Sequence, residues 1–131
     1  MSVVIDASAV VALLVDTGED GAWAEAASIG QELVTPHLMP VETTNILRRS
    51  TIAGRLSADA ATLAIGELAD MPVALVPFRP FSDRVWELRE TVTAYDAWYA
   101  ALAESLDAPL LTLDRRLARA SGLNCQVLTP R

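Results

Sequence analysis

Lysine is missing from this 131-residue chain, in which all ten basic residues are arginine. A P-loop places a lysine on its nucleotide phosphates, so the chain contains no such loop. Response-regulator receivers and haloacid-dehalogenase-like phosphatases also need a lysine, and the second class would need an aspartate in place of Ser8. The turn after the first apolar run, Asp6–Ala9, has no glycine, which argues against a dinucleotide-binding fold.

Cysteine and histidine each occur once. Cys125 therefore has no internal disulfide partner and is expected to act as a small apolar side chain, and a zinc site of the Cys/His kind is excluded. No apolar run approaches the roughly 20 residues of a membrane span. Val3–Val15 lacks a basic leader and is interrupted by Asp6 and Ser8, which argues against a signal peptide. Together these absences predict a cytoplasmic protein without a membrane partner.

Basic residues are outnumbered by acidic ones, and the net charge is −7. A nucleic-acid binder usually carries a basic surface, so this excess argues against such a role unless bound metal neutralises several carboxylates. The hydrophobic fraction of 52% argues against disorder. The length is typical of one domain, so we expect a single domain over residues 1–131.

Short apolar runs alternate with helical patterns along the whole chain. Pro36 and Pro40 bracket the start of a helix that should end at Ala53, and Ser57 is a suitable N-cap for the next helix, which should end at Met71. This alternation predicts an α/β fold with a parallel sheet and helices on both faces. The expected strands are Val3–Ile5, Glu32–Thr35, Val73–Val76 and Leu110–Leu113, with Gln126–Leu128 as an edge strand. The other expected helices are Ala7–Val15, Ala22–Ile29 after a turn at Gly18–Gly21, Ser82–Thr91 with Val85, Trp86 and Leu88 inward, Tyr95–Leu106 and Asp114–Ala120.

Four acidic residues stand where these elements begin or end. Asp6 and Asp114 each follow an expected strand directly, and Glu42 and Asp96 lie in the opening turns of expected helices. Ligands of open parallel sheets bind at the carboxyl ends of the strands, so Asp6 and Asp114 belong to the edge where such sites form. Carboxylates there would suit Mg²⁺ or Mn²⁺. The alternative is a purely structural role, in which Asp6, Asp96 and Asp114 are N-caps and Glu42 complements a helix dipole.

With these four motifs, the chain resembles the PIN-domain ribonucleases, and among them the VapC-type toxins of bacterial type II toxin–antitoxin modules. The resemblance implies a three-layer α/β/α PIN-like fold with a central parallel sheet of four to five short strands. It also implies endonucleolytic hydrolysis of RNA phosphodiester bonds by metal-activated water, a homodimer and a cognate antitoxin. The matching segments are Val4–Ala9, Pro40–Leu47, Tyr95–Glu104 and Leu111–Leu117.

The resemblance further implies a role for each site residue. Asp6 and Asp96 would be the main ligands of Mg²⁺, with Mn²⁺ as a substitute, and Glu42 and Asp114 would complete the catalytic site directly or through water. Ser8 and Thr112 would orient the carboxylates, as metal sites usually require. Whether one or two metal ions act, and which RNA is cut, stays open.

The remaining interpretations concern arginines and tryptophans. Arg115, Arg116 and Arg119 follow Asp114 on one short helix and could hold RNA phosphates, or they form a solvated helical face. Trp23, Trp86 and Trp98 are expected to pack in the core or a dimer interface. Two alternative functions remain: a catalytically weak PIN-like domain that binds RNA or a protein partner, and a PIN nuclease that acts on DNA.

Overall fold

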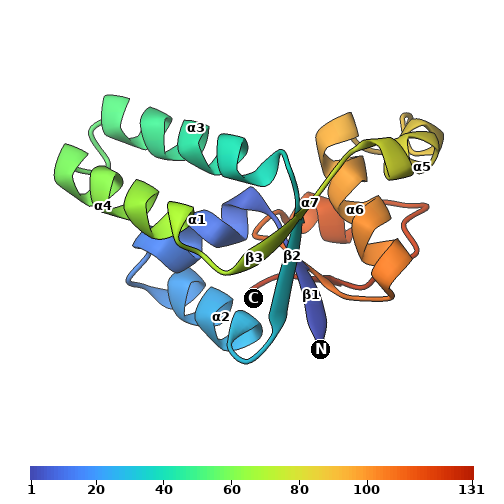
Figure 1. Ribbon diagram of the computed structural model, residues 1–131, viewed down its shortest axis with the longest axis horizontal. Helices are drawn as coiled ribbons and strands as arrows, with labels where there is room; N and C mark the ends of the chain where they lie inside the picture. The colour runs from blue at the N-terminus through green and yellow to red at the C-terminus, as the bar shows by residue number, and fades with distance from the viewer.

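A five-stranded parallel sheet forms the centre of the computed structural model, which describes residues 1–131 (Figure 1). Its strands run in the order β3-β2-β1-β4-β5, and every neighbouring pair is parallel. These strands form from the apolar segments in which the sequence predicted them. The short strands β4 and β5 lie at one edge of the sheet. The strands are β1 (Ser2–Ile5), β2 (Glu32–Pro36), β3 (Val73–Val76), β4 (Leu110–Leu111) and β5 (Val127–Leu128).

Helices cover both faces of this sheet and complete the expected three-layer α/β/α fold (Figure 1). The first group contains α1 (Ala7–Val15), α2 (Glu19–Ser28), α3 (Met39–Ile52) and α4 (Ala58–Ala69), and α1 packs against the other three. The second group contains α5 (Ser82–Glu87) and α6 (Ala94–Leu106), and α6 lies on β1, β2 and β4. A 3-10 turn (η1, Arg79–Phe81) precedes α5, and the short α7 (Arg115–Ala118) follows β4.

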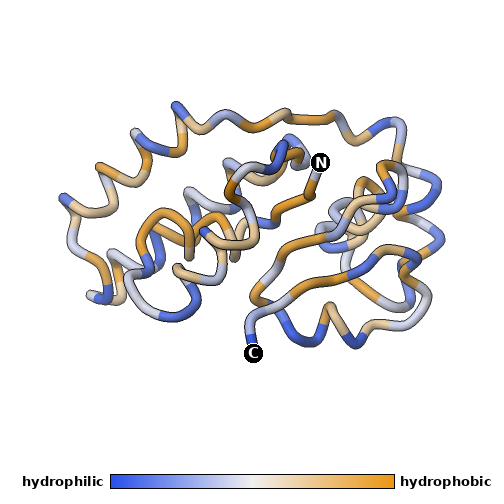
Figure 2. Tube along the Cα trace, turned by 90° about the horizontal axis from the view of Figure 1, so that it is seen from below, coloured by the Kyte–Doolittle hydropathy of each residue, from blue (hydrophilic) through white to orange (hydrophobic).

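The main core lies where β1 and β4 meet α1 and α6. Val4, Ile5 and Leu110 are fully buried, and Tyr99 and Leu102 of α6 pack against them. Complete burial of one such apolar side chain stabilises the fold by about 1.5–3 kcal/mol. Figure 2 shows that the apolar run after the N-terminus passes through the middle of the molecule, while most hydrophilic residues lie toward its periphery. The core therefore fixes the end of β1, which precedes Asp6, and the first turn of α6, which contains Asp96. It also fixes the end of β4, three residues before Asp114.

One prediction that proved wrong concerns the turn at Gly18–Gly21, because α2 begins at Glu19. Glu19 and Asp20 favour that start, since their charges complement the amino end of a helix. Gly21 is needed there for a different reason: a Cβ atom on it would lie 1.9 Å from the carbonyl oxygen of Asp16. The glycine that looked like a turn residue instead allows α2 to pack closely against the end of α1.

The elements near the site also differ from expectation at their ends. β4 stops at Leu111, so Asp114 is not the first residue past the strand. The amide of Leu113 donates to the hydroxyl of Ser8 rather than to a neighbouring strand. Thr93, and not Asp96, is the N-cap of α6. α5 ends at Glu87, and Trp86 points outward with 68% of its surface exposed.

The predicted caps elsewhere are correct. Asp6 caps α1 and Asp114 caps α7, each through its carboxylate, and Ser57 caps α4. Pro40 lies in the first turn of α3, where the missing amide hydrogen has no helical partner to lose. No helix in the structure combines the length and apolar character needed to cross a membrane.

Candidate functional site

Asp6 stands at the carboxyl end of β1, where its side chain is held by several donors. Its Oδ1 accepts hydrogen bonds from the Ser8 hydroxyl at 2.6 Å and the Ala9 amide at 3.0 Å, and its Oδ2 accepts one from the Thr112 hydroxyl. Asp6 is only 6% exposed, and burial raises its pKa although these hydrogen bonds oppose the rise. Ser8 and Thr112, the two residues predicted to orient the carboxylates, therefore both contact the carboxylate of Asp6.

The hydroxyls of Ser8 and Thr112 also connect Asp6 to the segment after β4. Ser8 Oγ accepts from the Leu113 amide and Thr112 Oγ1 accepts from the Asp114 amide, each at 3.0 Å. Strand pairing aligns Ile5 with Leu111, which brings the next residues of both strands side by side. Asp114 is thus positioned by hydrogen bonds that begin at Asp6, even though it lies three residues beyond the strand.

Glu42 comes to the site from the first turn of α3. Its Oε1 accepts a hydrogen bond from the phenol of Tyr99 at 2.7 Å. Burial raises the pKa of Glu42, the Tyr99 hydrogen bond works against the rise, and the charge of Asp6 adds to it. Tyr99 is 2% exposed, and burial together with Glu42 raises its own pKa, so the phenol remains a donor. Sequence reasoning missed Tyr99, although its position one helical turn after Asp96 places both on one face of α6.

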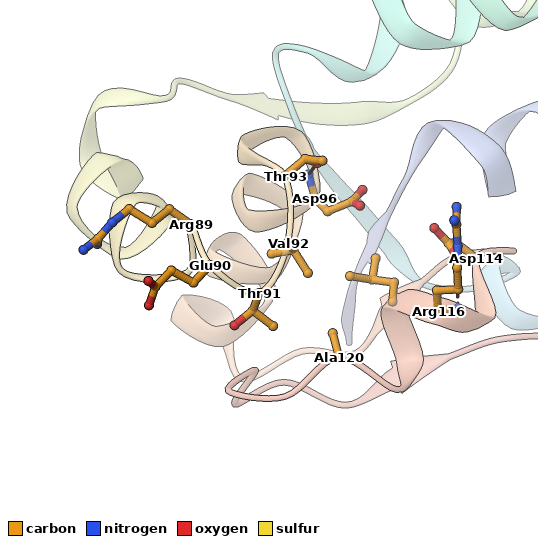
Figure 3. A pocket seen from close by; sticks show the side chains of 10 residues that line it. Arg89, Glu90, Thr91, Val92, Thr93, Asp96, Asp114, Arg116 and Ala120 are labelled. Carbon is orange, nitrogen blue, oxygen red and sulfur yellow. Dashed lines mark hydrogen bonds and ion pairs between the residues drawn. The ribbon is translucent and has the colours of Figure 1, made fainter.

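Asp96 and Asp114 face each other from α6 and α7. In Figure 3 the carboxylate of Asp96 points from α6 toward the end of the molecule that carries Asp114. Asp114 Oδ1 accepts from the Arg116 amide at 2.9 Å and lies 3.5 Å from Arg116 Nε. Burial, followed by the charges of Asp114, Asp6 and Glu42, raises the pKa of Asp96 to about 6, while Arg116 lowers it.

All four predicted acids line one cavity of about 160 Å³, together with Ser8 and Tyr99. Four parts of the fold supply them to this single place: the end of β1, the start of α3, the start of α6 and the start of α7. The electrostatic effects on Asp96 and Glu42 show that the carboxylates interact with one another. The fold therefore brings the four residues together into an acidic recess.

The donor set of this recess suits a hard divalent cation, because it consists of carboxylate and hydroxyl oxygens. The carboxylates share the cavity without converging on a point: no three acidic, histidine or cysteine side chains lie close enough to ligate one ion. Three of them are turned toward protein donors instead: Glu42 toward Tyr99, Asp6 toward Ser8 and Thr112, and Asp114 toward the Arg116 amide. In chemistry and in shared location these residues fit a metal, and their side chains would have to rotate to enclose it.

The three arginines after Asp114 do not share one environment. Only Arg116 lines the larger cavity of about 520 Å³ that adjoins the acids, and this cavity contains Asp96 and Asp114 in its wall (Figure 3). Arg115 and Arg119 do not line it. Trp86, expected inside, instead carries the guanidinium of Arg89 over its exposed ring, 4.7 Å from the ring centre.

Comparison with known proteins agrees with this geometry. The family model described as PIN domain matches residues 3–123. Ribonuclease VapC1 of Mycobacterium tuberculosis is 38% identical over 125 residues, which cover 95% of this chain and 94% of that protein. The structure of PAE2754 from Pyrobaculum aerophilum has a TM-score of 0.71 at 26% identity, covering 97% of this chain and 83% of that one. A VapBC-5 structure from M. tuberculosis, described as a member of the VapBC family of toxin–antitoxin systems, has a TM-score of 0.57 at 24% identity, covering 99% and 98%.

A three-layer fold with acids at the carboxyl edge of a parallel sheet, together with these matches, defines the class. The chain belongs to the PIN-domain family, and its similarity to a VapC ribonuclease over nearly its full length confirms the resemblance to VapC-type toxins.

Proposed function

We propose that this protein is a Mg²⁺- or Mn²⁺-dependent endoribonuclease and the toxin of a toxin–antitoxin pair. The observation that carries the proposal is the meeting of Asp6, Glu42, Asp96 and Asp114 in one recess, where burial and mutual repulsion raise the pKa of Asp96 to about 6. Repulsion of this kind is relieved by a cation, so the recess favours metal binding. The names of the relatives support RNA as the substrate.

Asp6 and Asp96 would be the principal metal ligands, with Glu42 and Asp114 completing the set. Bound metal supplies an acidified water and neutralises charge on a phosphodiester. The chain itself orients these groups: Ser8 and Thr112 hold the carboxylate of Asp6, and Tyr99 holds that of Glu42. Removing one charged ligand should therefore abolish cleavage, whereas removing a charge outside the recess should not.

The decisive experiment replaces Asp96 by Asn and measures cleavage of RNA with Mg²⁺ or Mn²⁺. We expect the rate to fall by at least about a hundredfold, because loss of a ligand removes several kcal/mol of charge stabilisation. Asp107→Asn is the matched control, since Asp107 follows the same helix at its other end, away from the recess. Full activity of Asp96→Asn would show that the recess is not the catalytic site.

The same experiment separates the two alternative functions. A PIN-like domain that only binds RNA or a protein partner would show no cleavage with either metal in the native protein. A DNA nuclease would cut a DNA strand of matched sequence faster than the RNA strand. The proposed RNA hydrolase should cut the RNA strand preferentially and stop when the metal is chelated.

The toxin role implies an inhibitory protein partner and action in the cytoplasm, where the RNA is. Solved structures of similar fold come from toxin–antitoxin systems, which supports a cognate antitoxin. A homodimer is part of the same proposal. An apolar recess of about 480 Å³ between α3, α4 and β3 is a surface that a second chain could cover.

A further inference from the structure

We propose that the larger cavity beside the acids is a binding subsite for one unpaired ribonucleotide of the RNA strand, next to the bond that is cut. We name it the flanking subsite and define it by residues 89–93 on one side and Arg116, Leu117 and Ala120 on the other. The inference rests on the proposed nuclease function, because the acidic recess fixes where the scissile phosphate lies. The inference adds the direction in which the RNA strand leaves the acidic recess and names the residues that hold the RNA.

The first argument is continuity. Asp96 and Asp114 line both the acidic recess and the flanking subsite, so a strand whose phosphate lies at the acids can continue into the larger space without crossing a wall. Figure 3 shows the two sides of this space, with Thr91, Val92 and Thr93 opposite Arg116 and Ala120. A volume of about 520 Å³ is within the range of small-ligand pockets, which run from about 300 to 1,000 Å³, and suits one nucleotide.

The second argument is the chemistry of the lining. Val92 and Ala120 provide an apolar surface for a base, with the nearly buried Leu117 also in the lining. The hydroxyl of Thr91, and that of Thr93, which accepts from the Asp96 amide and can still donate, are suited to the 2′-hydroxyl that distinguishes ribose. Recognition of RNA by sequence-reading proteins mostly targets unpaired nucleotides, whose bases can enter such recesses. The base and the ribose of a ribonucleotide therefore each meet a matching group.

The third argument is charge. The acidic recess offers no cation to a phosphate, and Arg116 is the nearest guanidinium that lines the adjoining space. Arg89 also lines it, but in Figure 3 its side chain extends away from Asp96, and its guanidinium lies over the Trp86 ring. The side chain of Arg116 is 87% exposed, and its contact with Asp114 is a long one of 3.5 Å. Exposed pairs are worth about 0–1 kcal/mol, so a phosphate can displace Asp114 from Arg116 at little cost.

Binding of RNA tests the subsite separately from cleavage. The full chain carrying Asp6→Asn, which prevents turnover, is titrated into a fluorescein-labelled pool of short random-sequence RNA strands, and anisotropy is followed at several salt concentrations. Arg116→Ala should weaken binding about three- to tenfold at low salt and reduce the salt slope by about 1. The matched control is Arg115→Ala, which changes the same charge on the same helix outside the cavity and should stay within about twofold.

A second pair of variants tests the space itself. Ala120→Phe occupies part of the flanking subsite and leaves every carboxylate of the site in the sequence, and we expect affinity for the RNA pool to fall by about tenfold. Ala118→Phe adds the same ring to an exposed position of α7 that does not line the cavity, and it should bind like the parent. Thermal melting of all four variants identifies any loss that comes from unfolding.

The outcomes distinguish this inference from the function on which it rests. If the native chain cuts RNA while Arg116→Ala and Ala120→Phe bind the pool as the parent does, the flanking subsite is wrong and the nuclease proposal stands. If the native chain never cuts RNA but the two variants lose binding as expected, the subsite stands and the nuclease proposal fails. Equal affinity for a DNA pool of the same composition would overturn ribose recognition and leave the space as a site for single-stranded nucleic acid of either kind.

Discussion

At the scale of single residues, Tyr99 is the group that most clearly shapes the site without carrying charge. Its buried phenol donates to one oxygen of Glu42 and leaves the other oxygen free. A hydrogen bond to a charged group is worth about 1.5–3 kcal/mol, so Tyr99 determines the orientation of that carboxylate. The acids of the recess are thus not four independent ligands, because hydrogen-bond donors set the direction of Asp6, Glu42 and Asp114.

We expect Tyr99→Phe to raise the Mn²⁺ concentration for half-maximal RNA cleavage several-fold and to lower the free energy of unfolding by about 1–3 kcal/mol. The reason is that Glu42 loses the donor that orients it. Metal titration of cleavage and urea unfolding measure the two effects. Tyr95→Phe is the matched control, because Tyr95 lies one turn earlier on α6 with 58% of its surface exposed. An unchanged Mn²⁺ midpoint in Tyr99→Phe would contradict the positioning role.

At the scale of elements, the sequence predicts most of the architecture and less of the detail at element ends. The apolar runs of β1 and β3 and the caps Asp6 and Ser57 are local signals, and the structure contains them where expected. The end of β4 depends on a contact with a residue distant in the chain, the hydroxyl of Ser8, and the start of α2 depends on how closely Gly21 approaches the carbonyl of Asp16. Short-range patterns do not contain such contacts, which is also why Tyr99 was missed while the four acids were found.

The pair α3 and α4, with the edge strand β3, leaves apolar side chains exposed, and we expect this surface to form the homodimer. Ile65 lines its recess and is 38% exposed. A charge at this position would be desolvated in an apolar interface, at a cost of several kcal/mol. Ile65→Arg should therefore be monomeric in sedimentation equilibrium, while the native chain is a dimer. Leu63→Arg, on another face of α4, should remain dimeric; a dimeric Ile65→Arg variant or a monomeric native chain would exclude this interface.

At the scale of the whole molecule, the acidic recess that the proposed function needs lowers the stability of the folded protein. The net charge is −7, and three of the four site carboxyls have a raised pKa with burial as the first cause. A group whose pKa is raised by folding destabilises the ionised native state. The protein without metal should therefore be less stable at neutral pH than it would be with these groups neutral. A cation that binds only the native state raises the free energy of unfolding again.

The stability cost of the recess can be measured by substituting Asp96. Its pKa rises from 3.8 to about 6 on folding, so its contribution to stability is largest below 3.8 and is lost as the pH rises toward 6. With chelator present near neutral pH, Asp96→Asn should be more stable to urea than the native chain by about 1–2 kcal/mol, once screening at this partly exposed group is allowed for. Below about pH 4 the native carboxyl is neutral, and the difference should shrink toward zero. The matched control is Asp107→Asn, because Asp107 follows the same helix and does not line the recess. If Asp96→Asn were no more stable than the native chain at neutral pH, neither burial nor the neighbouring carboxylates would be destabilising the ionised Asp96, and the physical basis for a metal in the recess would be lost.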